Sequence, residues 1–358
     1  MASPTEIVAM RRALELAARG AATARPNPVV GAVVLDTSGA VAGEGWHQQA
    51  GGPHAEVLAL AAAGDRAAGG TVVVTLEPCS HTGRTGPCTV AVRDAGVRRV
   101  VVSTVDPTPG AGGGADALRA AGLDVETGVL TAEGERVNRR WLTAVRTGRP
   151  WVVWKFAATL DGRSAAADGT SRWISSPESR ADTHALRAAS DAVIAGSGTV
   201  LADDPALTVR DAAGMPTGRQ PLRVVVDTHG RTPAGAKVRD ETADTWIATA
   251  AELGTDPCGH VDLSALLREL FARGSRVALL EGGPRLAGAF LRAGLVDEVV
   301  AYLAPTLLGD GLSAVAGTGV ATLGDAFALD IEDVRRLGPD VRITGRHRRT
   351  PSSTIVEV

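Results

Sequence analysis

Long apolar runs are missing from this sequence of 358 residues. No stretch reaches the roughly 18 apolar residues that a membrane-spanning helix requires, and the first residues lack the apolar core of a signal peptide. Runs of basic residues are also missing, since 37 Lys and Arg stand against 40 Asp and Glu, for a net charge of −3. Because a nucleic-acid partner needs a cationic face, we expect a cytoplasmic protein that acts on a free small molecule, without a nucleic-acid or membrane partner. Homo-oligomerisation is left open.

Cysteine and lysine are scarce. The three cysteines suit a reducing compartment, and Cys258, in a loop-like Thr-Asp-Pro-Cys-Gly stretch, is interpreted as a bystander. Only two of the 37 basic residues are lysines, Lys155 and Lys237. A lysine kept against such a preference for arginine is a candidate for a role that needs its compact ammonium, and chance is the alternative.

Length and patterning predict two α/β domains. A chain of 358 residues exceeds what one core usually supports, and 44% hydrophobic residues in short runs are typical of a globular α/β protein. The boundary is predicted within residues 146–150, which separates domain 1–147 from domain 150–358. The first domain is expected to be a three-layer α/β/α sandwich. Its predicted helices are 4–19, 56–63, 88–95, 116–121 and 133–144, and its predicted strands are 29–35, 41–45, 71–76 and 100–103.

One histidine and two cysteines in this first domain predict a catalytic zinc site. His54, Cys79 and Cys88 supply three protein ligands for a tetrahedral ion and leave the fourth position for a water. Glu56 stands two residues from His54 and is predicted to be the proton shuttle of a hydrolytic deamination, not a ligand.

The alternative is that the cysteines only fill the core. Against it, each follows a proline, Pro78 or Pro87, and is expected to open a helix whose dipole favours the thiolate. The strand predicted over residues 71–76 would deliver its ligand at its C-terminal end. The spacing of the two cysteines departs from the Cys-x-x-Cys pattern of zinc deaminases, because eight residues separate them. A loop of this length is long enough to have a second role.

Two strand–glycine–helix turns mark the second half. They lie at residues 196–199 and 277–286, and the free backbone N–H groups of such turns suit a dinucleotide or a phosphorylated substrate. Neither is a full dinucleotide-binding fingerprint, and simple turn geometry is the alternative for each.

The segment at residues 78–88, PCSHTGRTGPC, resembles the PCSHxGRTPPC signature of the bifunctional riboflavin-biosynthesis deaminase/reductase family, with Gly86 where the family usually has proline. The similarity continues at residues 25–31, 43–47 and 52–57 and across the second half. It implies a cytidine-deaminase-like first domain, a dihydrofolate-reductase-like second domain, Zn²⁺ and NADPH as cofactors, and a phosphorylated pyrimidine as substrate.

The resemblance also implies the contacts of the reductase domain. By position, the cofactor contacts of the family fall on Ala157, Trp173, Thr199, Asp203, Thr228, Gly283, Pro284 and Arg285. Its substrate contacts fall on Lys155, Ser164, Ser171, Arg187, Leu207, Arg210 and Glu281.

Physical roles can be attached to several of these positions. Arg187 and Arg210 could each hold a phosphate, Glu281 could accept hydrogen bonds from a pyrimidine or ribityl hydroxyl, and Lys155 or Asp203 could handle a proton. Plain alternatives stay beside them: Arg187 on a solvent-facing helix side, Asp203 at a helix end and Trp173 in the core. In the cysteine loop, Arg84 is the candidate for the substrate phosphate of the deaminase.

The sequence thus predicts deamination of 2,5-diamino-6-ribosylamino-4(3H)-pyrimidinone 5′-phosphate followed by reduction of its ribosyl side chain with NADPH. Two other classes remain: a deaminase of a free base or nucleoside whose second half only binds or assembles, and a non-catalytic zinc-stabilised protein. Glu56 beside the ligands argues against the latter, and the paired glycine turns argue against the former.

Overall fold

Residues before and after the Gly148–Arg149 bond form separate units in the computed structural model. It describes residues 1–81, 86–108, 110 and 112–348. Within these ranges, no helix combines the length and hydropathy that crossing a bilayer demands.

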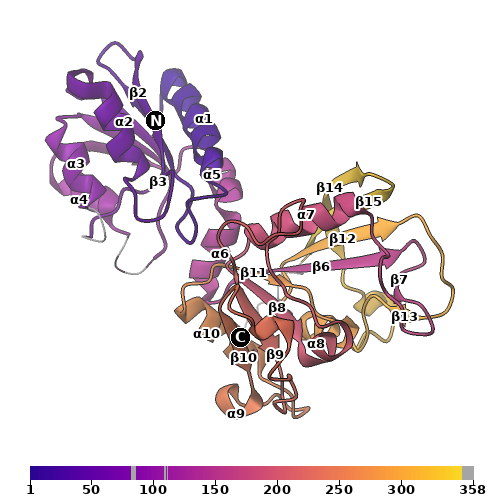
Figure 1. Cartoon of the computed structure of the whole chain (residues 1–358). Coiled ribbons are helices and arrows are strands. Elements are labelled where there is room, and N and C mark those ends of the chain that lie inside the picture. The colour runs from indigo at the N-terminus through magenta and orange to yellow at the C-terminus, as the bar shows by residue number, and fades with distance from the viewer. Residues whose placement is uncertain (82–85, 109, 111, 349–358) are drawn as a thin grey trace, which may run out of the picture. The chain divides into compact units, whose positions relative to one another are not determined.

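A five-stranded sheet in the order β2-β1-β3-β4-β5 forms the centre of the N-terminal unit (Figure 1). Strand β1 pairs antiparallel with β2 and β3, while β3, β4 and β5 run parallel. The inner strands are valine-rich and buried along their length, which is typical of a sheet covered on both faces. Their bounds are β1 (Gly31–Leu35), β2 (Val41–Trp46), β3 (Thr71–Leu76), β4 (Arg99–Thr104) and β5 (Asp124–Thr127).

Helices cover both faces of this sheet, so the predicted three-layer α/β/α architecture is confirmed. One face packs on α1 (Pro4–Arg19) and α5 (Thr131–Val137), around buried Met10, Val33 and Val101. The other face packs on α2 (Ala55–Ala63), α3 (Cys88–Asp94) and α4 (Gly114–Ala120). Helix α1 begins at a capping box between Ser3 and Glu6. A short 3-10 turn, η1 (Gly64–Ala67), follows α2.

The single helix predicted over residues 133–144 is wrong, because the segment forms two helices, α5 and α6 (Arg139–Thr147), with Asn138 between them. Buried Asn138 turns its side-chain amide to the backbone of Val29, accepting from its N–H at 2.9 Å and donating to its carbonyl at 2.8 Å. Its φ of −102° departs from helical geometry. The break therefore serves a contact 109 residues away in the chain, which helical periodicity does not reveal.

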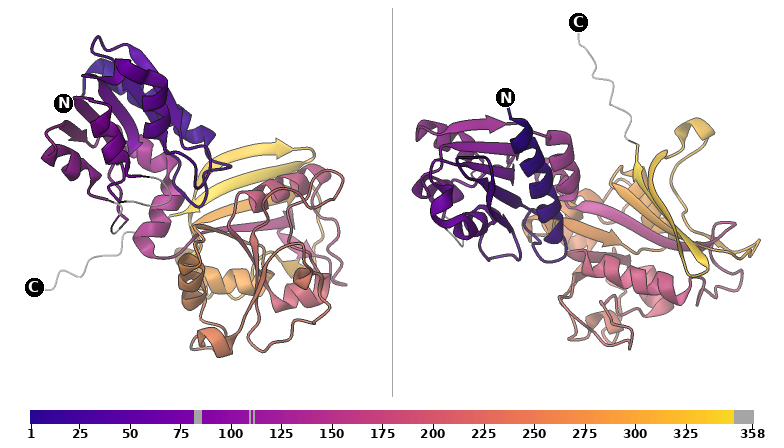
Figure 2. Two further views of the ribbon diagram at one scale, coloured as in Figure 1. Left: turned by 60° about the vertical axis from the view of Figure 1, so that its left-hand side comes forward. Right: turned by 90° about the horizontal axis from the view of Figure 1, so that it is seen from above.

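The C-terminal unit contains an eight-stranded sheet in the order β10-β9-β8-β11-β6-β12-β15-β14. The strands from β10 to β12 run parallel, and β14 and β15 add an antiparallel pair at one side, yellow in Figure 2. Strands β7 and β13 form a separate pair. The bounds are β6 (Trp151–Thr159), β7 (Arg163–Ala165), β8 (Ala192–Gly196), β9 (Leu222–Val226), β10 (Thr245–Ala248), β11 (Val277–Leu280), β12 (Glu298–Ala304), β13 (Leu312–Ser313), β14 (Leu329–Leu337) and β15 (Asp340–His347).

Two apolar layers flank this second sheet. One includes α10 (Leu263–Ala272) and α11 (Pro284–Arg292), and the other includes side chains of α7 (Pro177–Ala188) and α8 (Ser197–Asp203). Shorter elements are η2 (Lys237–Arg239), α9 (Ala250–Leu253) and η3 (Leu323–Asp325). Helices α8 and α11 each follow a parallel strand through a glycine turn, as the sequence predicts. Because parallel strands end at a common edge, the two turns meet at the carboxyl edge of the sheet, where α/β proteins usually bind ligands.

Candidate active sites

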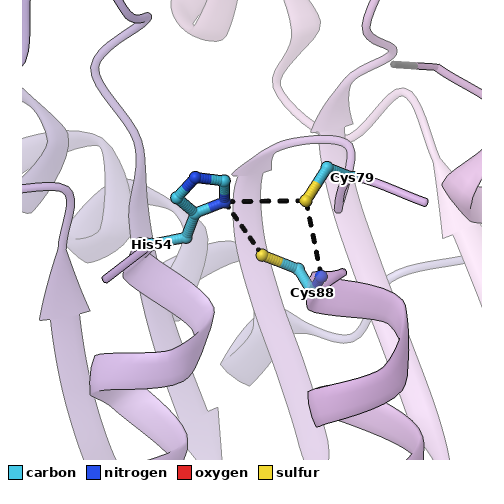
Figure 3. Close-up of side chains that lie close together, drawn as sticks. All are labelled: His54, Cys79 and Cys88. Carbon is cyan, nitrogen blue, oxygen red and sulfur yellow. Dashed lines mark hydrogen bonds between the residues drawn. The ribbon is translucent and has the colours of Figure 1, made fainter. Parts of the chain in front are cut away.

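His54, Cys79 and Cys88 bring their ligand atoms together in the N-terminal unit (Figure 3). The Nδ1 atom of His54 lies 3.1 Å from the Cys88 sulfur and 3.6 Å from the Cys79 sulfur, and all three ligand atoms lie within 4.8 Å of one another. Bonds of about 2.0 to 2.3 Å in a tetrahedron would separate nitrogen from sulfur by about 3.5 Å. The donor set and its spacing therefore fit one zinc ion, with His54 ligating through Nδ1.

The two cysteines differ in protonation, because the hydrogen bond with Cys79, together with burial, raises the pKa of the Cys88 thiol. The hydrogen bond with Cys88, with a smaller contribution from His54, lowers the pKa of the Cys79 thiol to about 4, although burial acts in the opposite direction. Cys79 also accepts a hydrogen bond from the backbone N–H of Cys88 at 3.4 Å. One thiolate is thus already stabilised at neutral pH, and a zinc ligand must be a thiolate.

The elements that carry the ligands differ from the prediction in one respect. His54 caps the N-terminus of α2 and Cys88 is the first residue of α3, but Cys79 lies in the irregular segment after β3 and opens no helix. The prediction that both cysteines begin helices is therefore wrong for Cys79. Its backbone carbonyl instead accepts a hydrogen bond from Thr89 N in α3, which ties the two cysteines together locally.

Two glycines of β2 set the position of α2. A Cβ atom at Gly45 would lie 2.5 Å from the carbonyl oxygen of Ala55, and one at Gly43 would lie 2.2 Å from that of Ala59. Only glycine allows α2 to rest this closely on the strand. The close approach fixes the helix start that holds His54 and Glu56.

Glu56 lies in the first turn of α2 and is buried, with 3% of its surface exposed. Burial raises the pKa of its carboxyl. A carboxyl with a raised pKa exchanges a proton more readily near neutral pH, which suits a general acid and base. Arg84 falls outside the described residues.

In the C-terminal unit, most of the predicted contacts gather at the carboxyl edge of the sheet. Lys155 and Ala157 lie on β6, Thr199 and Asp203 on α8, and Thr228 in the loop after β9. Glu281 and the Gly283-Pro284-Arg285 turn follow β11. This edge is built from segments more than a hundred residues apart in sequence.

Arg187 and Glu281 bind each other there. The Arg187 Nε and Nη2 atoms lie 2.6 and 2.8 Å from the two carboxylate oxygens of Glu281, a bidentate pair between side chains 15% and 9% exposed. The solvent-facing alternative for Arg187 is therefore wrong. Burial acts to raise the pKa of Glu281, but Arg187 and, more weakly, Lys155 hold it below its usual range.

Lys155 completes this cluster. Burial lowers the pKa of its ammonium, an effect that the Glu281 carboxylate opposes and the Arg187 cation reinforces. Its Nζ lies 5.6 Å from the ring centre of Tyr302. A lysine with a lowered pKa, held beside a buried ion pair, can give or accept a proton.

The two glycine turns touch each other. The backbone N–H of Gly283 donates to the Thr199 hydroxyl at 3.1 Å, and Gly283 caps α11, whose first helical residues are Pro284 and exposed Arg285. A helix start beside a cation is a suitable place for the pyrophosphate of a nicotinamide dinucleotide, because the positive end of the helix dipole favours an anion. These residues therefore fit the cofactor that the resemblance implies.

The remaining predicted residues lie outside the strands of this eight-stranded sheet. Arg210 donates through Nε to the Thr208 hydroxyl at 3.0 Å, and Leu207 before it is buried with a φ of +52°. Ser164 on β7 donates to main-chain oxygens of β13 at 3.2 and 3.3 Å. Ser171 is half-buried. Trp173 is 69% exposed under the Arg180 guanidinium, so the core alternative is wrong for this residue.

Two family models match this chain, one in each unit. Residues 4–104 match the cytidine and deoxycytidylate deaminase zinc-binding region, and residues 150–343 match the RibD C-terminal domain. The second match covers more than half of the chain. This chain belongs to the RibD family.

Relatives agree with this assignment along the whole length. The chain is 45% identical over 355 residues to the riboflavin biosynthesis protein RibD of Escherichia coli strain K12, a match that covers 93% of this chain and 96% of that protein. It is 47% identical over 337 residues to RibD of Mycobacterium tuberculosis, covering 94% and 96%. The RibD family combines a zinc-dependent deaminase with a reductase in riboflavin biosynthesis, and this chain has both domains.

Solved RibD structures share the fold. A crystal form of Acinetobacter baumannii RibD matches with a TM-score of 0.85 and 39% identity, covering 96% of this chain and 99% of that one. The diaminohydroxyphosphoribosylaminopyrimidine deaminase/5-amino-6-(5-phosphoribosylamino)uracil reductase of Thermotoga maritima matches with a TM-score of 0.82 and 34% identity, with the same coverage. The C-terminal unit is therefore the dihydrofolate-reductase-like domain of RibD.

This RibD chain also places side chains near its sites that the sequence did not single out. His47 is buried, its ring packs edge-on against that of His54 with centroids 5.3 Å apart, and its Nε2 lies 3.1 Å from Asn27 Nδ2. In the reductase domain, Tyr302 donates to Asp182 at 2.6 Å. The only sequence signal was that His47 and Asn27 lie in segments resembling the family; Tyr302, the single tyrosine, stood in an ordinary strand pattern.

Replacing a zinc ligand should remove the metal from this RibD chain. We expect Cys88→Ser to reduce bound zinc from one ion per chain to near zero, because serine seldom replaces a thiolate in a three-ligand site. Ammonia release should be lost with the metal. Metal analysis of purified protein measures the first effect, and Cys258→Ser, at an exposed cysteine, is the matched control. Unchanged zinc in Cys88→Ser would contradict the ligand set.

Removing one partner of the Arg187–Glu281 pair should destabilise the C-terminal unit of this chain. We expect Arg187→Leu or Glu281→Leu to cost about 3–5 kcal/mol each, because either change leaves a buried charge uncompensated. The double variant should cost less than the sum. Urea unfolding measures these differences. In the control pair Arg93 and Asp94, both side chains are more than half exposed, and single changes there should cost less than about 1 kcal/mol. Additive losses at 187 and 281 would contradict the coupling.

Proposed function

We propose that the N-terminal unit deaminates 2,5-diamino-6-ribosylamino-4(3H)-pyrimidinone 5′-phosphate and that the C-terminal unit then reduces the ribosyl side chain with NADPH. The product is 5-amino-6-ribitylaminouracil 5′-phosphate. The observation that carries the proposal is the convergence of His54, Cys79 and Cys88 beside buried Glu56 in a chain that continues into a RibD reductase domain.

In the deaminase unit, His54, Cys79 and Cys88 would hold the zinc ion, which when bound supplies an activated water. Glu56 takes a proton from that water and delivers it to the exocyclic amine, so that ammonia leaves and a carbonyl replaces it on the ring. The raised pKa of buried Glu56 supports this transfer. His47 would keep the His54 ring in its orientation through their edge-on contact.

In the reductase unit, the Gly283 turn, Thr199 and Arg285 would bind the pyrophosphate of the cofactor, which supplies a hydride to C1′ of the ribose. Lys155 would deliver the accompanying proton to the opened ring oxygen. The Arg187–Glu281 pair would hold Lys155 in place and offer the Glu281 carboxylate to a ribityl hydroxyl or the pyrimidine. Arg210 is the candidate cation for the substrate phosphate in this unit, and Arg84 is the candidate in the other.

We also propose that the protein works in the cytoplasm. Its two ligand cysteines must stay reduced to bind zinc, which suits a reducing compartment.

The test is a coupled assay on purified zinc-loaded protein with the diaminopyrimidinone phosphate, following ammonia and NADPH absorbance together. Ammonia release followed by stoichiometric NADPH oxidation is the expected result. Ammonia without NADPH oxidation, also when the deaminated intermediate is supplied directly, would contradict the reductase step and leave the second unit a binding or assembly role. If neither ammonia release nor NADPH oxidation is observed, both steps are contradicted.

A further inference from the structure

Three neighbouring strand ends form a continuous row at the carboxyl edge of the reductase sheet. Strands β11, β8 and β9 are adjacent and parallel. The Gly283–Thr199 hydrogen bond joins the β11 turn to α8. On the other side, Arg231 in the loop after β9 donates through Nη2 to the Ser197 hydroxyl at the start of α8, at 3.1 Å. The row therefore runs from the proposed pyrophosphate site to Arg231.

The dimensions of this row suit an adenosine ribose. Adjacent strands lie about 4.8 Å apart, so the ends of β11 and β9 are separated by about 10 Å. A dinucleotide whose pyrophosphate lies at Gly283 and whose adenosine extends across β8 brings the 2′ position of its ribose toward the β9 loop. Thr228, half-buried at the start of that loop, is already a predicted cofactor contact.

The acidic residue at the end of β9 is not turned toward such a ribose. In proteins that prefer NAD, a carboxylate at this kind of position binds the ribose 2′-hydroxyl, whereas an arginine nearby accommodates the 2′-phosphate of NADP. Here Asp227 is fully buried, and one carboxylate oxygen accepts from both the N–H and the hydroxyl of Thr232 at 2.7 Å. Burial acts to raise the pKa of Asp227, but these bonds, together with those from the Arg231 backbone and Ser197, lower it.

Asp227 thus shapes its own loop and presents Arg231, whose side chain is exposed. We propose that Arg231, anchored at the start of α8 by its hydrogen bond to the Ser197 hydroxyl, binds the 2′-phosphate of NADPH and gives the reductase its preference for NADPH over NADH. This inference rests on the proposed reductase function. It assigns Arg231 and Arg285 different roles: Arg285, at the start of α11, faces the pyrophosphate that both dinucleotides share.

The experiment measures equilibrium binding of 2′,5′-ADP and 5′-AMP, which differ only in the 2′-phosphate, by titration calorimetry, with NADPH and NADH as full-length probes. In the unaltered protein we expect 2′,5′-ADP to bind about 10- to 100-fold more tightly than 5′-AMP, the range of a charge-assisted contact. Arg231→Gln should bring that ratio close to one by weakening only the 2′-phosphorylated ligands, and Arg231→Lys should keep part of it. Arg285→Gln should weaken NADPH and NADH by a similar factor, because both carry the pyrophosphate.

Arg239→Gln, at an exposed arginine of η2, is the matched control and should leave both dissociation constants unchanged. A ratio that survives Arg231→Gln, or a ratio near one in the unaltered protein, would overturn the assignment of Arg231 while leaving the reductase proposal intact. Failure of the unaltered protein to bind NADPH at all would instead overturn the reductase proposal, and the assignment with it.

Discussion

Glu56→Gln should lower the rate of ammonia release by about 100- to 10,000-fold, the range that general acid–base catalysis contributes. Glutamine keeps the shape and most of the packing of this buried side chain, but it cannot carry a proton from water to the amine. Because Glu56 is not among the three converging ligands, the zinc content should stay at one ion per chain. Steady-state kinetics with the diaminopyrimidinone phosphate measures the loss, and metal analysis measures the zinc.

The same variant tests whether the two sites act independently. Reduction of supplied deaminated intermediate should be unaffected by Glu56→Gln, because every residue assigned to that step lies beyond Arg149. Glu15→Gln, at an exposed glutamate on α1, should alter neither activity. Loss of zinc in Glu56→Gln would make Glu56 a ligand or a structural residue, and loss of both activities in a folded protein would contradict separate sites.

The deaminase site was largely predictable from the sequence because its information is local. His54 and Glu56 share one helix start, and the cysteines follow a buried strand within a single motif. What the sequence could not reveal is how the pieces approach each other. The glycines of β2 looked like ordinary strand positions until their contact with α2 showed that a side chain would collide with the helix. Asn138 and His47 likewise act through partners distant in the chain.

The reductase site was harder to predict because its side chains converge from scattered segments. Glycine turns after strands were visible as local patterns, and the structure has both. The pairing of Arg187 with Glu281 joins residues 94 positions apart, and no periodicity relates them. The sequence predicted a separate substrate contact for Arg187 and for Glu281. In the structure the two side chains bind each other, so neither charge is available to the substrate alone. Only the resemblance to the family brought these positions into one site.

Lys155→Met should lower the rate of NADPH oxidation by about 100- to 10,000-fold while ammonia release continues. Methionine preserves the length and apolar stem of the side chain and removes only the ammonium. If Lys155 transfers a proton, kcat should fall far more than the affinity for NADPH, because the glycine turns and Arg285 remain in place. Single-turnover reduction of the deaminated intermediate, with a separate titration of NADPH binding, distinguishes the two effects.

Lys237→Met is a closely matched control, since Lys237 is the other lysine of the chain and its ammonium is exposed beside Asp204. The pH profile separates proton transfer from simple positioning. Burial lowers the pKa of Lys155, and the protonated form is the donor, so kcat for reduction should decline as pH rises through a pKa below the usual 10.5 of lysine. Lys155→Met should lack that decline in its residual rate. A Lys155→Met variant that kept the decline would show that another group donates the proton, with Asp203 the first to examine. Loss of NADPH binding with unchanged kcat would show that Lys155 instead holds the cofactor.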